Sequence, residues 1–123
     1  AENVAAGGDA LFRIDFYTTD GEVHVRNKAH LASIMDRVQT WADTKNAPVY
    51  IGEVGTGAPS FENGKGGLTW AEDMVSLCLE KNIHFTYFDY HDSNFGIYLG
   101  DNSLPDPNNV RQPLIDWFTG NLN

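Results

Sequence analysis

The sequence predicts an α/β fold in which strand-then-helix units follow one another along the chain. Three apolar, β-favouring runs, at 11–17, 48–52 and 83–89, begin about 35 residues apart, a spacing typical of parallel strands joined by crossover helices. Between these runs, apolar residues recur at helical spacing. With 123 residues the chain forms at most one ordinary domain, so we treat 1–123 as a single region.

The first unit joins the strand at 11–17 to a long helix. Its apolar residues recur on one face over about four turns: Leu31, Ile34, Met35, Val38, Trp41 and Ala42. Asn27 is placed to cap the start of this helix, and Asn46 with Pro48 to end it. The tryptophans on the helices are expected to pack in the core: Trp41, Trp70 and Trp117.

The next two helices also carry start signals. Thr69 and Glu72 have the spacing of a capping box, and an apolar face follows, made of Ala71, Met74, Val75 and Cys78. The last helix is predicted to begin near Val110, with Pro113 in its first turn and Leu114, Trp117 and Phe118 turned inward. A competing signal lies at Asp20-Gly21, which favours a β-hairpin between 16–17 and 23–25 and leaves an α+β fold open.

Composition excludes several classes of function. The net charge is -9, with only 8 Lys and Arg, which argues against binding to a nucleic-acid backbone. No apolar stretch is long enough to cross a membrane, and no signal-peptide pattern opens the chain. The single cysteine, Cys78, lies among apolar residues and is expected to be a buried structural thiol. The histidines lack metal-ligand spacing, so we expect neither a metal nor another cofactor.

Glu53 is the leading candidate for a catalytic residue. It ends the apolar run 48–52, and a loop rich in glycine and small residues follows at 55–60. Parallel α/β proteins place their chemistry at the carboxyl ends of strands, before such loops. Aromatic, histidine and aspartate side chains end the strand at 83–89 as well. A surface glutamate at a strand end is the alternative interpretation.

These segments resemble glycoside hydrolase family 5, the family of cellulases and mannanases. The run PVYIGEVG at 48–55 resembles the strand-seven signature of that family, in which the glutamate is the catalytic nucleophile. Residues 85–92 and 95–98 resemble strand eight and its loop, and 11–17 resembles strand six. The resemblance implies the C-terminal part of a (β/α)8 TIM barrel, a half-barrel fragment, from a retaining endo-β-1,4-glycanase with Glu53 as nucleophile.

The resemblance also implies the residues around the substrate. Tyr17 carries over from a His-x-Tyr pair near the substrate, where Asp15 replaces the histidine. Phe88 is the nearest match to a tryptophan that forms the sugar platform in many members, and Tyr90 and His91 are candidates for the glycan groove. The implied substrate is a polysaccharide or oligosaccharide, and the family habit of degrading external polysaccharide implies secretion.

The second catalytic group is missing from the pattern. A full barrel needs about 250 residues, and the family's acid/base glutamate follows an asparagine, whereas this chain has no Asn-Glu dipeptide. The acid/base then lies outside this chain, or Asp15, Asp89 or Asp92 supplies it. The expected partners are the missing N-terminal half of the barrel or a second copy. Two alternatives stay open: a non-catalytic carbohydrate-binding or self-associating half barrel, and an unrelated small α/β or α+β domain.

Overall fold

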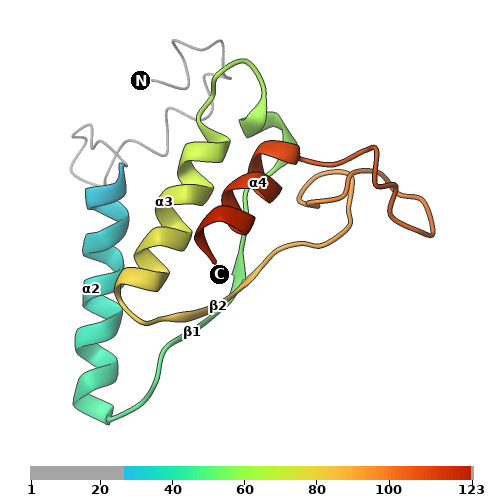
Figure 1. The fold of residues 1–123 in the computed structure, drawn as a ribbon. Helices are drawn as coiled ribbons and strands as arrows, with labels where there is room; N and C mark the ends of the chain where they lie inside the picture. The colour runs from blue at the N-terminus through green and yellow to red at the C-terminus, as the bar shows by residue number, and fades with distance from the viewer. Residues whose placement is uncertain (1–26, 123) are drawn as a thin grey trace.

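The computed structural model describes residues 27–122 and gives a mixed α/β arrangement (Figure 1). Its elements, in chain order, are helix α2 (Lys28–Lys45), strand β1 (Tyr50–Val54), the 3-10 helix η2 (Ala58–Phe61), helix α3 (Gly67–Glu80), strand β2 (His84–Tyr87) and helix α4 (Gln112–Asn121). The predicted strand at 11–17, with Asp15 and Tyr17, and the alternative hairpin lie outside the described residues.

The two strands form a parallel sheet with α3 as the crossover between them. Tyr50 lies opposite His84, and Val54 lies opposite Tyr87, with an irregularity in the register between Ile51 and Val54. The prediction of parallel strands is confirmed for these two runs. The predicted bounds were two residues early for β1, since Pro48 cannot donate a ladder hydrogen bond. β2 is shorter than predicted, and a cis peptide bond joins residues 88 and 89 just beyond its end.

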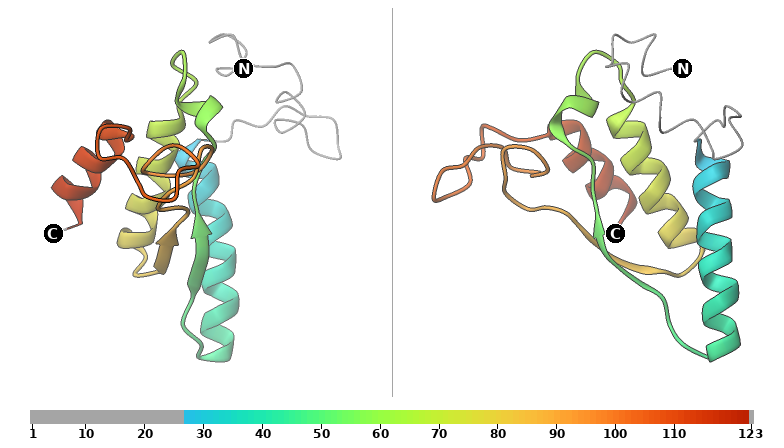
Figure 2. Two further views of the ribbon diagram at one scale, coloured as in Figure 1. Left: turned by 90° about the vertical axis from the view of Figure 1, so that its right-hand side faces the viewer. Right: turned by 180° about the vertical axis from the view of Figure 1, so that it is seen from behind.

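All three described α-helices cover the same face of this sheet. In the left-hand view of Figure 2, both strands are seen broadside with no helix in front of them. Ile51 and Phe85 pack toward the helices, whereas Tyr50, His84 and Thr86 are exposed on the other face. Parallel sheets are normally covered on both faces. Within residues 27–122, one face of this sheet is therefore bare.

The hydrophobic core lies between α2, α3 and the sheet. Its buried centre consists of Met35, Leu77, Cys78 and Ile83, and partly buried residues surround it: Leu31, Ala32, Val49, Ile51, Met74 and Phe85. Burial raises the pKa of the Cys78 thiol above its ordinary value, because a thiolate would lose its hydration there. The prediction of a buried thiol is confirmed.

Helix α2 has the predicted ends but not the predicted packing. The Asn27 side chain accepts a hydrogen bond from the His30 N–H at 3.1 Å, and Asn46 closes the helix with a φ of 50°. Several residues predicted to be in the core are exposed instead: Ile34 by 38%, Val38 by 45% and Trp41 by 62%. The prediction that they pack inside was wrong because α3 covers only one side of α2.

Helices α3 and α4 keep their predicted inner faces. The capping box at Thr69 is not formed: α3 begins at Gly67, and its N-cap Gly66 has a φ of 87° and no side-chain cap. The helix starts early because Gly67 packs under η2, where a Cβ would lie 2.5 Å from the Ser60 hydroxyl oxygen. The predicted inward residues of α3 and α4 are buried at Ala71, Val75, Cys78 and Leu114, and half-buried at Met74, Trp117 and Phe118.

Candidate active-site edge

Glu53 lies at the carboxyl end of β1, as predicted. It is the last residue but one of the strand, and its side chain is exposed. Within residues 27–122, no hydrogen bond or ion pair engages its carboxylate. The carboxylate is therefore free to meet a ligand from the solvent side of the sheet edge.

The end of β2 reaches the same edge. The Phe88 N–H donates a hydrogen bond to the Val54 carbonyl at 2.8 Å, directly after Glu53. Gly55 makes this approach sterically feasible, because a Cβ at position 55 would lie 1.9 Å from the Phe88 carbonyl oxygen. The backbone thus brings Glu53 and Phe88 to one edge, although they are far apart in sequence.

Two of the predicted substrate-binding aromatics present accessible surface in the segment after β2. Phe88 is 37% exposed, and its ring centroid lies 5.6 Å from that of Phe95. Tyr90 is 63% exposed and lies 5.1 Å from Tyr98, so its ring is supported from behind. Supported aromatic rings of this kind can pack against the apolar faces of a ligand.

His91 is less accessible than its predicted role requires. Its Nε2 atom is buried and has no hydrogen-bond partner in the described part of the chain. The same holds for the Tyr87 hydroxyl and for Oδ1 of Asp89. In this conformation a ligand outside the loop does not reach Nε2 of His91.

Asp92 orders the loop that carries these aromatics. Its carboxylate accepts hydrogen bonds from the backbone N–H groups of Asn94 at 2.8 Å and Phe95 at 2.6 Å. These bonds, that from Phe95 first, lower the pKa of the Asp92 carboxyl below its ordinary value. A carboxyl held ionised in this way is poorly suited to donate a proton to a leaving group. Among the described carboxylates, Asp92 is therefore an unsuitable general acid.

Arg111, which the sequence analysis did not single out, holds the loop after β2 in place through hydrogen bonds from its side chain. It is only 9% exposed, and its Nε and Nη2 atoms donate to the carbonyls of Gly96 at 2.9 Å and Asn94 at 2.8 Å. Its guanidinium carbon lies 4.3 Å from the centroid of the Phe61 ring in η2. The helix was predicted to begin near Val110, and an arginine in its first turn gives no sign in the sequence of this role; in the structure α4 begins at Gln112 and Arg111 is its N-cap.

Asn94 links the same loop to the one that follows Glu53. The Ala58 N–H donates to the Asn94 backbone carbonyl at 2.7 Å and to its side-chain oxygen at 3.1 Å. Gly57 allows the contact, because a Cβ there would lie 2.9 Å from that side-chain oxygen. The loops after β1 and β2 therefore form one hydrogen-bonded body, with Arg111 and Asn94 at its centre.

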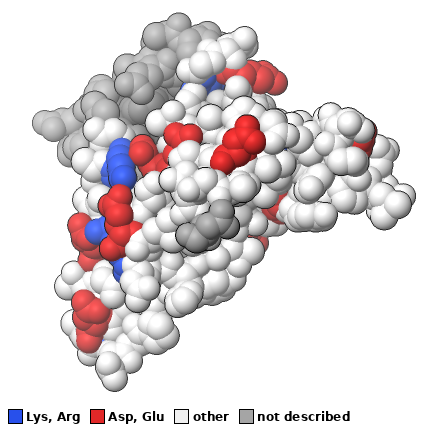
Figure 3. Space-filling model, in the orientation of Figure 1, with Lys and Arg blue, Asp and Glu red and all other residues white. Residues whose placement is uncertain are grey.

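The surface charge is concentrated away from this body. Acidic and basic side chains lie next to one another over α2 and α3 (Figure 3), where Lys28 pairs with Glu80 at 2.8 Å and Lys81 pairs with Asp36. The side of the molecule formed by the loop after β2 carries few charged side chains in this view. Residues 88–110 nevertheless include four aspartates and no lysine or arginine, so this side of the molecule disfavours an anionic ligand.

Other kinds of site find little support. Within 27–122, no group of three or more histidine, cysteine, aspartate or glutamate side chains is arranged to hold a metal ion. None of the helices that the structure describes is both long and apolar enough to span a membrane.

The geometry thus defines a mixed α/β protein with a carboxylate and aromatic rings at the carboxyl edge of a parallel sheet. No protein-family model matches the chain, and no curated protein matches it significantly.

Proposed function

We propose that this chain is the C-terminal part of a glycoside hydrolase of family 5. The enzyme would be a secreted, retaining endo-β-1,4-glycanase that hydrolyses a polysaccharide or oligosaccharide. One observation carries the proposal: Glu53 lies at the carboxyl end of a parallel strand, and Phe88 and Tyr90 follow the neighbouring strand at the same edge. A neutral glycan needs this combination of a carboxylate for the chemistry and rings for the sugar faces.

Glu53 would act as the nucleophile. Its carboxylate oxygen attacks the anomeric carbon, the bond to the leaving oxygen breaks, and that oxygen takes a proton from an acid. Water then attacks the same carbon and gives a proton to the conjugate base of that acid; the glycosyl ester bond breaks, and the Glu53 carboxylate is restored. In the family pattern, Tyr17 would orient this carboxylate, with Asp15 beside it; both lie outside the described residues.

The bare face of the sheet supports a larger barrel around this edge. Tyr50 and Thr86, whose hydroxyl groups are hydrogen-bonded to each other, are exposed on that face, where a parallel sheet normally meets further protein. The strands would then be the seventh and eighth of a barrel. Because the Asp92 carboxyl is held in its ionised form, the acid/base would come from the N-terminal half of the barrel, or from Asp15 or Asp89.

A second candidate function is a non-catalytic carbohydrate-binding half barrel. The exposed ring of Tyr90, supported by Tyr98, favours binding without requiring Glu53. Under this alternative, oligosaccharide binding would depend on Tyr90 and Phe88 and would be indifferent to Glu53→Gln.

Hydrolysis assays separate the two candidates. We would measure turnover of β-1,4-glucans, β-1,4-mannans and 2,4-dinitrophenyl β-cellobioside, whose leaving group departs without a proton and so bypasses a missing acid. Glu53→Gln should abolish turnover, whereas Glu62→Gln, at another exposed glutamate, should not. Binding of cellohexaose that is unaffected by Glu53→Gln, with no turnover of any substrate, would select the binding function instead.

A further inference from the structure

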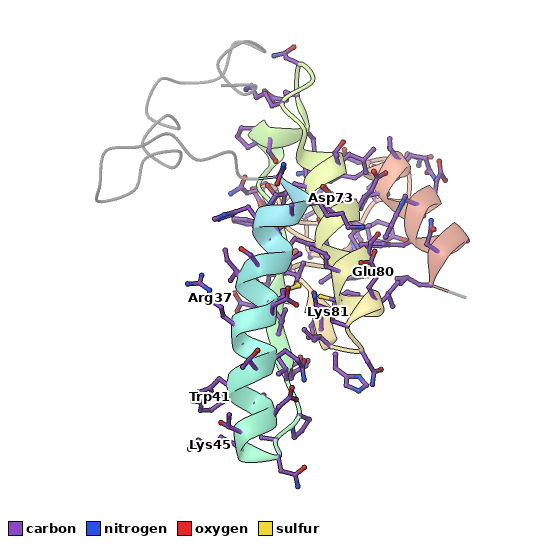
Figure 4. The ribbon with its side chains drawn as sticks, turned by 90° about the vertical axis from the view of Figure 1, so that its left-hand side faces the viewer. Arg37, Trp41, Lys45, Asp73, Glu80 and Lys81 are labelled. Carbon is purple, nitrogen blue, oxygen red and sulfur yellow. The ribbon has the colours of Figure 1, made fainter. Side chains whose placement is uncertain are left out.

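Helix α2 has a second apolar side that the core does not use. We define the outer stripe of α2 as Ile34, Arg37, Val38, Trp41 and Lys45, each of which lies three or four residues from another member and so on the same side of the helix. The stripe lies along the side of α2 that faces away from α3 (Figure 4). Trp41 is 62% exposed, and its neighbours Ile34, Arg37 and Val38 line with it a shallow depression of about 290 Å³.

The stripe also holds cations that have no partner in the described part of the chain. Elsewhere on the described surface, Lys28, Lys65 and Lys81 each form a salt bridge with a carboxylate. Arg37 and Lys45 form none. In a chain of net charge -9, two unpaired cations beside an exposed tryptophan are a local reversal of the overall charge.

We infer that the outer stripe of α2 is a docking surface for an acidic amphipathic helix of another polypeptide. Apolar residues at helical spacing provide a seam into which the apolar face of a second helix can pack. Arg37 and Lys45 lie about 12 Å apart along the helix axis, so the partner would carry acidic residues about two turns apart beside its apolar face. The exposed Trp41 would fill the centre of the interface, as tryptophan does at many binding hot spots.

The positions of the charges disfavour a second copy of this helix as the occupant. Trp41, at the centre of the stripe, lies four residues from Arg37 and four from Lys45. A twofold axis at Trp41 would set Arg37 beside Lys45 of the partner subunit, and like charges so close repel each other. A helix with acidic flanks meets no such repulsion. The inference does not depend on the proposed glycosidase function, because the stripe lies on α2 and Glu53 lies in β1.

The test uses two synthetic helical peptides of about 18 residues, or five turns. Both carry leucine at helical spacing; one has glutamates two turns apart beside the leucines, and the other has lysines in their place. Isothermal titration of the full chain with each peptide should show binding of the acidic peptide only. Trp41→Ser should weaken that binding roughly tenfold or more. Leu104→Ser, at a leucine 76% exposed on the loop after β2, is the matched control and should leave it unchanged.

The role of the two cations in binding is tested by reversing their charges. The double substitution Arg37→Glu, Lys45→Glu should abolish binding of the acidic peptide and create binding of the lysine peptide. Equal binding of both peptides by the unmodified chain, or binding of neither, would overturn the inference. So would a dimer of the unmodified chain in sedimentation equilibrium that Trp41→Ser dissociates, since a second copy would then cover the stripe.

Discussion

At the scale of single residues, Gly55 sets how closely the segments carrying Glu53 and Phe88 approach. A methyl group at position 55 would meet the Phe88 carbonyl oxygen at 1.9 Å, and this neighbour is backbone, which cannot rotate away as a side chain can. The identity of one residue beside the candidate nucleophile therefore controls the separation of the two strand ends.

Gly55→Ala should destabilise the protein by roughly 1–3 kcal/mol, the usual cost of an added group in a packed site. Gly120→Ala is a matched control for which we expect the opposite change in the free energy of unfolding. Position 120 lies in α4 with no atom within 4 Å of a Cβ, so alanine there should stabilise by roughly 0.5–1 kcal/mol. Urea denaturation of the two variants measures both values. If both substitutions changed the free energy of unfolding by the same small amount, that result would contradict the close approach of position 55 to the Phe88 carbonyl.

Asp92 makes the stability of the loop after β2 depend on pH. Its pKa is lowered in the folded protein, so its contribution to stability is complete above the ordinary value of 3.8 and is lost as the pH falls through the folded pKa. Asp92→Asn keeps an oxygen that can accept the Asn94 and Phe95 N–H bonds but cannot titrate.

The unmodified chain should therefore be more stable than Asp92→Asn at pH 7, and the difference should shrink as the pH falls below 3.8. Urea midpoints of both proteins, measured at pH 7 and at steps below pH 4, check this. A difference that stays constant across that range would show that the Asp92 charge has no part in holding the turn.

At the scale of elements, Arg111 joins the start of α4 to the loops that follow both strands. Its side chain bonds to the Gly96 and Asn94 carbonyls, and its backbone N–H donates to the Ile97 carbonyl at 2.9 Å. The carbonyls it reaches would be left without these donors if the guanidinium were removed. The cost of such a loss is larger than that of an ordinary surface contact.

Arg111→Met should lower the free energy of unfolding by about 2–4 kcal/mol, since hydrogen bonds from charged donors are worth roughly 1.5–3 kcal/mol each. Arg37→Met, at an exposed arginine without a described partner, should change it by less than about 0.5 kcal/mol. Hydrogen exchange should also show faster exchange of the Ala58 amide in Arg111→Met, because that amide donates to the Asn94 carbonyl. Unchanged exchange at Ala58 would refute the link between the two loops.

The sequence predicts the elements better than their contacts. Asn27 and Asn46 mark both ends of α2 because caps act within one turn. The start of α3 was misplaced because it depends on Gly67 packing beneath Ser60, a contact between segments that no local pattern contains. Trp41 was misplaced because helical spacing shows that a side is apolar without showing whether another element covers it. At the candidate site, Glu53 and the aromatics after β2 followed from strand-end positions, whereas Arg111 acts through distant carbonyls and left no pattern.

At the scale of the whole molecule, two surfaces lie uncovered by the part of the chain that the structure describes. One face of the parallel sheet is bare within 27–122, and the outer stripe of α2 is uncovered on the side away from α3. The bare face is consistent with the proposal that this chain supplies the nucleophile and part of the glycan groove, while other βα units supply the acid/base, and the stripe is the surface inferred to dock an acidic helix. The proposed hydrolysis depends on Glu53 as the nucleophile.

The most direct test is covalent trapping with 2,4-dinitrophenyl 2-deoxy-2-fluoro-β-cellobioside and its mannobioside counterpart. The activated leaving group needs no general acid, and the fluorine slows hydrolysis of the glycosyl-enzyme ester, so a chain without its acid/base can still be labelled. Mass spectrometry of digested protein should find the fluoroglycosyl group on Glu53, and Glu53→Gln should remain unlabelled while Glu62→Gln is labelled normally. No label, or a label on another residue, would contradict the assignment of Glu53 as the nucleophile.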